Sequence, residues 1–105
     1  MKIITKAKNI ADALLPAARV WVRKSVANLD DEIRQTVAAC MLDLNNAGVK
    51  NFEEEDPLLQ QAAKLYLKAH FGYDDKSEKW EAAYEHLKAA LSLSSDYTEV
   101  PKSDG

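Results

Sequence analysis

The chain has 105 residues, 47% of them hydrophobic and 30% charged, and its formal net charge is −3. This length suits one small domain, and the composition is typical of a globular rather than a disordered protein. No apolar run approaches the roughly 20 residues of a membrane span, and no signal peptide is recognisable, so we expect a soluble protein made inside the cell, with no membrane association. With only three Gly and three Pro, the composition favours an all-α fold.

The first half of the chain predicts a basic segment and two helices. Residues 1–9 are polar and rich in lysine, and we expect them to be loosely ordered. A first helix should run from about residue 13 to residue 24, because Pro16 is tolerated only near a helix start. A second helix, near residues 29–47, opens in an acidic group that the helix dipole favours and ends at Gly48.

The second half predicts two further helices and a tail. A loop containing Glu53, Glu54 and Glu55 should be exposed, because adjacent carboxylates repel one another. The third helix, 57–71, has Asp56 as its cap, Pro57 at its first position and Gly72 at its end. A fourth helix is expected near 76–91, where Asp75 and Glu78 have the spacing of a capping box.

The chain thus reads as a basic N-terminal segment 1–9, a small four-helix domain 10–91 and a polar flexible tail 92–105. Apolar residues at helical spacing predict the core. They are Trp21, Ile33, Val37, Met41, Leu44, Leu58, Leu65, Tyr66, Tyr84 and Leu87.

The residues with reactive side chains do not form a catalytic or metal-binding pattern. Cys40 lies on an apolar helix face, which predicts a buried, inert thiol. His70 should pack or donate a hydrogen bond to a carbonyl at the end of its helix, and His86 should be exposed. One Cys and two separated His do not make a zinc site, the three glutamates lack the spacing of a calcium loop, and no glycine loop could bind phosphate. We therefore predict no enzyme activity, no cofactor and no metal.

Charge is segregated along the chain. Residues 1–28 carry a net charge of +5 and residues 29–63 a net charge of −6. Such segments can be complementary between neighbouring subunits or can bring the basic end to phosphates, although solvated faces explain the same pattern. As a candidate subunit interface we pair a basic face with the acidic loop. The basic face comprises Arg19, Arg23 and Lys24, and the acidic loop comprises Glu53, Glu54 and Glu55.

The sequence also bears on DNA binding. The first two predicted helices, joined by residues 25–28, have the outline of a helix-turn-helix. However, Asp30, Asp31 and Glu32 open the second helix, where a recognition helix would meet phosphates. Specific DNA reading is not expected, while loose contact through the N-terminal lysines stays open.

Taken in order, several segments resemble the small head–tail connector proteins of tailed bacteriophages and prophages, often called DNA-packaging proteins. The likeness spans roughly residues 10–97. The matching segments are Val22-Arg23, Leu29-Asp30-Asp31-Glu32-Ile33, Gly48-Val49, Asp56-Pro57-Leu58, Ala62, Tyr66, His70-Phe71-Gly72 and Tyr84 with Leu87.

The resemblance implies a homo-oligomeric ring in the virion, made in the bacterial host cytoplasm. It would join the portal to the tail-side proteins after DNA packaging, with genomic DNA passing through the lumen without specific binding. The family has no catalytic residues to transfer. The alternative is a small helical regulatory or DNA-associated protein acting as a monomer or dimer.

Overall fold

The computed structural model describes residues 3–22, 29–71 and 76–99. These residues form five helices and no strand, so the predicted all-α class is confirmed for the described chain. The helices are α1 (Ile3–Val22), α2 (Asp30–Asn46), α3 (Pro57–Phe71), α4 (Ser77–Ser92) and the short α5 (Ser95–Thr98). The second, third and fourth lie within one residue of their expected bounds.

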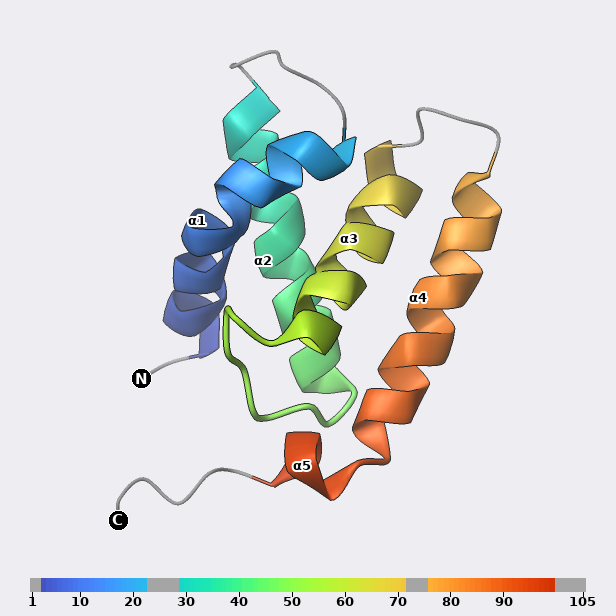
Figure 1. Cartoon of the computed structure of the whole chain (residues 1–105). Coiled ribbons are helices and arrows are strands. Elements are labelled where there is room, and N and C mark those ends of the chain that lie inside the picture. Colours follow the sequence, from blue (N-terminus) through green and yellow to red (C-terminus); the bar gives the residue numbers. More distant parts are fainter. Residues whose placement is uncertain (1–2, 23–28, 72–75, 100–105) are drawn as a thin grey trace.

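The helices pack in a simple order (Figure 1). α1 packs on α2 and also on α3, α3 packs between α2 and α4, and α4 lies at the outer edge. The chain between α2 and α3 passes beside α5 at one end of the molecule. Direct packing between α2 and α4 is slight, so α4 is attached to the rest of the fold mainly through α3.

α1 begins at Ile3, about ten residues before the expected start, and residues 3–9 are helical rather than loosely ordered. The apolar spacing continues N-terminally through Ala7, Ile10 and Ala11, all buried, so packing extends the helix. Pro16 consequently lies inside the helix. A proline there lacks the N–H that would bond the preceding turn, and α1 is bent (Figure 1). The bend brings the second half of α1 over α3.

The core is formed by α1, α2 and α3, with smaller contributions from α4. Of the expected core residues, Ile33, Val37, Met41, Leu44, Leu65 and Tyr84 are buried. Trp21, Tyr66 and Leu87 are only partly buried at its edge. Leu58 was predicted wrongly, because it is 43% exposed while Leu59, the next residue, is 1% exposed and fills the core position.

The residues predicted to end α2 and to cap α3 are confirmed. Gly48 has φ +113°, the left-handed region that favours glycine. The Asp56 carboxylate accepts a hydrogen bond from the backbone N–H of Leu58 at 2.8 Å, which caps α3. Gly72 and Asp75 lie outside the described residues.

The chain after α4 differs from the flexible tail that we expected from Ser92. Residues 95–98 form α5, and the Tyr97 hydroxyl donates to the Asp56 carboxylate at 2.8 Å. The Tyr97 carbonyl accepts from the backbone N–H groups of Lys50 and Asn51, at 2.6 and 3.1 Å. The chain is therefore held against the loop before α3 as far as Glu99, and residues 100–105 lie outside the described residues.

Candidate subunit interface

Arg19, a predicted interface residue, is bound within its own chain. Its guanidinium donates two hydrogen bonds to the Asp30 carboxylate, with Nε 2.9 Å from Oδ1. This contact raises the pKa of Arg19 and lowers the pKa of Asp30. It joins the end of α1 to the start of α2. Arg23 and Lys24, the other two basic residues of the prediction, lie outside the described residues.

Two of the three acids in the first turn of α2 form ion pairs within the chain. Asp30 pairs with Arg19, and Asp31 pairs with Arg34 at 3.0 Å. Arg34 also reaches Asp12 of α1 at 3.2 Å. These pairs all lie on the surface. Two of them join α2 to α1 and the third lies within α2, so the charges of these acids are already matched within the chain.

The acidic loop is different, because its three carboxylates are exposed and unpaired. Glu53, Glu54 and Glu55 make no ion pair with any other described residue. The backbone of the loop is nevertheless held in place: Phe52 is 3% exposed, and the Gln60 amide donates to the Glu54 carbonyl at 2.8 Å. Together with Lys6, Asn9, Ile10 and Phe52 the three glutamates line an open groove of about 520 Å³.

A basic and aromatic cleft lies where the end of α1 meets α3. Val20, Trp21, Lys64 and Lys68 line it, and its volume is about 150 Å³. The Lys68 ammonium also lies over the Trp80 ring, 4.6 Å from the ring centre. Sequence reasoning missed this cleft. Lys64 and Lys68 are four residues apart and so share a helix face, but only the bend of α1 brings Val20 and Trp21 to that face.

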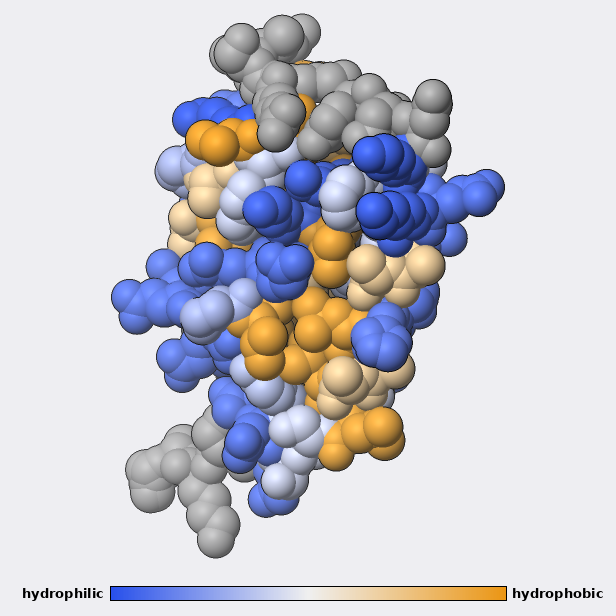
Figure 2. All heavy atoms as spheres, turned by 45° about the vertical axis from the view of Figure 1, so that its right-hand side comes forward, coloured by the Kyte–Doolittle hydropathy of each residue, from blue (hydrophilic) through white to orange (hydrophobic). Residues whose placement is uncertain are grey.

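The outer side of the molecule, where α4 lies, carries a band of hydrophobic side chains flanked by hydrophilic ones (Figure 2). The exposed apolar residues of α4 and of the turn after it are Ala82, Ala89, Ala90 and Leu93, the last 87% exposed. Exposed apolar patches rimmed by polar residues are typical of interaction surfaces.

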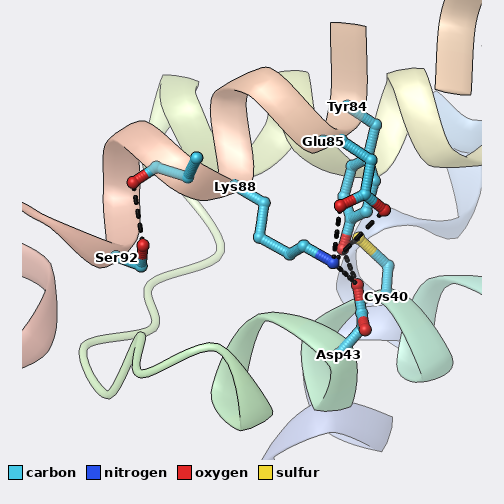
Figure 3. A network of polar contacts seen from close by, with 7 residues as sticks. Cys40, Asp43, Tyr84, Glu85, Lys88 and Ser92 are labelled. Atoms are coloured by element: carbon cyan, nitrogen blue, oxygen red, sulfur yellow. Dashed lines mark hydrogen bonds and ion pairs between the residues drawn. The ribbon is translucent and has the colours of Figure 1, made fainter. Parts of the chain in front are cut away.

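A polar network joins α2 to α4 at the partly exposed edge of the core (Figure 3). The Tyr84 hydroxyl and the Lys88 ammonium both donate to the Asp43 carboxylate, at 2.7 and 2.9 Å. Lys88 also pairs with Glu85 at 3.0 Å, and the Cys40 sulfur lies 3.8 Å from the Tyr84 hydroxyl. Burial raises the pKa of the Cys40 thiol to about 12. The thiol is therefore protonated at neutral pH, as a structural rather than a nucleophilic cysteine should be.

The two histidines lie as expected. His70, in the last turn of α3, donates through Nδ1 to the Tyr66 carbonyl at 2.9 Å and stacks on the Tyr66 ring. His86 is exposed. In the described part of the chain, no group of three or more His, Cys, Asp or Glu residues is placed to hold a metal ion. None of its helices combines the length and the apolarity needed to cross a membrane.

The described residues thus form a small helical protein with an exposed acidic loop, a basic cleft and exposed apolar side chains on α4. Residues 18–98 match the family described as phage connector protein, so the chain belongs to that family. The match begins in the second half of α1 and includes all of α5. Neither a curated protein nor a solved structure gives a match. The family is a structural one, which makes this protein a connector component of a phage particle and indicates contact with other head or tail proteins.

Proposed function

We propose that the protein is a head–tail connector subunit that assembles into a ring between the portal and the tail-side proteins after DNA packaging. The observation that carries the proposal is the family match over residues 18–98, which takes in the end of α1 and all of α2 to α5. The protein would be made in the cytoplasm of the bacterial host and would end in the virion. Packaged DNA would pass through the lumen of the ring.

Two surface features support assembly. A ring requires heterologous contacts, in which two different surfaces of each subunit meet. The unpaired acidic loop Glu53–Glu55 is one such surface, and the basic cleft where the end of α1 meets α3 is the other. The apolar band along α4 offers an additional surface for a head or tail protein.

The mass of the particle tests the proposal. The protein is measured by native mass spectrometry and negative-stain electron microscopy, alone and mixed with the portal protein of the same phage. We expect a closed ring in at least one of the two samples. A monomer or a closed two-fold dimer in both samples would contradict the proposed function.

A further inference from the structure

The cleft at the end of α1 contains two lysines that no carboxylate of the described residues neutralises. Arg19, the residue before Val20, is already paired with Asp30. Lys64 and Lys68, by contrast, have no carboxylate partner within residues 3–22, 29–71 and 76–99. Val20, which lines the same cleft, is 72% exposed, a high value for a valine side chain. The cleft thus combines exposed apolar surface with two ammonium groups that have no carboxylate partner among the described residues, although that of Lys68 also lies over the Trp80 ring.

The acidic loop is complementary in charge to this cleft, but no ion pair joins the two within the described residues of one chain. Glu55 lies just before the first turn of α3, whereas Lys68 lies eleven residues after Pro57. At 1.5 Å per residue the helix separates Pro57 from Lys68 by about 17 Å. A pairing of the loop with Lys68 must therefore join two molecules, and Lys64, about 10 Å along the helix from Pro57, makes no ion pair with the loop within the described residues.

We propose that the cleft lined by Val20, Trp21, Lys64 and Lys68 receives the Glu53–Glu55 loop of a second copy of this chain. This inference rests on the proposed ring and names its contact. The glutamate carboxylates of one subunit approach the two ammonium groups of the next, while Val20 and Trp21 cover the neighbouring loop. Because the two surfaces differ, repetition of the contact gives a head-to-tail series of subunits, which closes into a ring when the rotation per subunit allows.

Charge reversal in both surfaces tests the contact by loss and rescue. The variant K64E/K68E carries an acidic cleft and an acidic loop, and the variant E53K/E54K/E55K carries a basic cleft and a basic loop. Each variant alone should assemble only at concentrations at least about tenfold above the wild type, because like charges meet. An equimolar mixture should regain assembly, since each loop then finds a cleft of opposite charge. The combined five-fold variant should regain it as well.

A cysteine pair tests the geometry directly and leaves the charges of the cleft intact. V20C/E54C should give a ladder of cross-linked oligomers on mild oxidation, because residue 20 of one copy then lies beside residue 54 of the next. V20C/E81C is the matched control, since Glu81 is also an exposed acid but lies on α4, and it should give no ladder. The buried thiol of Cys40 need not be replaced.

The outcomes separate this inference from the proposed function. Rings that persist in both charge variants, or a ladder equally strong in the control, would overturn the inference and leave the connector ring standing. Absence of rings in the wild type, with and without portal, would overturn both. If K64E/K68E lost duplex DNA binding while its assembly was unchanged, the cleft would be a phosphate site and the inference would be wrong. Circular dichroism verifies that each variant is folded.

Discussion

At the scale of single residues, Asp43 makes the most consequential polar contacts. It accepts hydrogen bonds from Tyr84 and Lys88 and so links α2 to α4, two helices that otherwise barely touch. Burial alone would raise the pKa of Asp43, but the hydrogen bonds from Tyr84 and Lys88 outweigh it and lower the pKa overall. The ionised form is therefore favoured by folding.

This shift predicts a pH-dependent effect of Asp43→Asn. A carboxyl whose pKa is lowered in the folded state stabilises the fold above its unfolded pKa and loses that contribution as the pH falls through the folded pKa. At pH 7 we expect Asp43→Asn to lower the free energy of unfolding by about 1–3 kcal/mol, the usual range for hydrogen bonds to a charged group. The difference from wild type should shrink between about pH 5 and pH 2.

Urea unfolding at several pH values measures this difference. Asp31→Asn is the control, because that carboxylate is 86% exposed and pairs only with Arg34 of its own helix. It should change the free energy of unfolding by no more than about 0.5 kcal/mol. A deficit of the Asp43 variant that was equally large at pH 2 would show that the charge of Asp43 is not what stabilises the contact.

Core residues give a second prediction at this scale. Met41 is fully buried and Leu65 is 7% exposed, so replacing either by Ala should cost about 2–5 kcal/mol of stability. Leu58→Ala, at a site 43% exposed, should cost clearly less, about 1 kcal/mol or below. Thermal unfolding of the three variants compares them, and equal losses in all three would show that burial does not govern these sites.

At the scale of elements, α5 closes the structure at the end where the acidic loop lies. The Tyr97 carbonyl accepts hydrogen bonds from the backbone N–H groups of Lys50 and Asn51, and its hydroxyl bonds Asp56, the cap of α3. Burial, with the hydrogen bond to Asp56, raises the pKa of Tyr97 to about 12. The phenol therefore remains a donor throughout the neutral range.

Removing the Tyr97 side chain should release this end of the chain. In Tyr97→Ala we expect hydrogen exchange at the amides of Lys50 and Asn51 to become about tenfold faster or more. In the wild type, local opening must break the contacts that the partly buried Tyr97 ring makes, and the variant lacks these contacts. The Val49 amide is an internal control, because it donates to the Leu44 carbonyl at the end of α2. Unchanged exchange at Lys50 and Asn51 would mean that α5 is held by other contacts.

At the scale of the whole molecule, the charge distribution bears on DNA. The net charge is −3, and α2 begins with three acidic residues, of which Asp30 and Asp31 are paired with arginines. A wall along which DNA slides must not hold phosphates tightly. Proteins that neutralise 6–10 phosphates lose about 10³–10⁵ in affinity between 50 and 200 mM salt.

We therefore expect at most weak, sequence-independent DNA association that disappears near physiological salt. Gel-shift titrations on random and defined duplexes, at about 50 and 150 mM salt, measure it. Tight binding to one defined sequence at the higher salt would favour the regulatory alternative over the connector. Assembly is measured independently, by the mass of the particle, so tight DNA binding can be distinguished from a failure to form a ring.

The sequence predicted the fold class and the main helices because their signals are local. Asp56 and Pro57 mark the start of α3, Gly48 supplies the left-handed residue after α2, and apolar spacing marks the faces that are buried. Where the prediction failed, packing had overridden a local rule. Pro16 was expected near a helix start, yet the apolar face of α1 continues on both sides of it. The polar residues after Ser92 were expected to be flexible, yet Tyr97 packs against a distant loop.

The candidate interface divides in the same way. The sequence by itself determined that the chain is helical, that its charges are segregated and that Glu53–Glu55 form an exposed acidic loop, since these follow from neighbours along the chain. Only the tertiary structure decided that Arg19 is bound to Asp30, while Lys64 and Lys68 lie beside Val20 with no carboxylate partner in the described part of the chain. Charges attract over a few ångströms in space, and the distances between helices depend on the bend of α1 and on the packing of the core, which no local pattern contains.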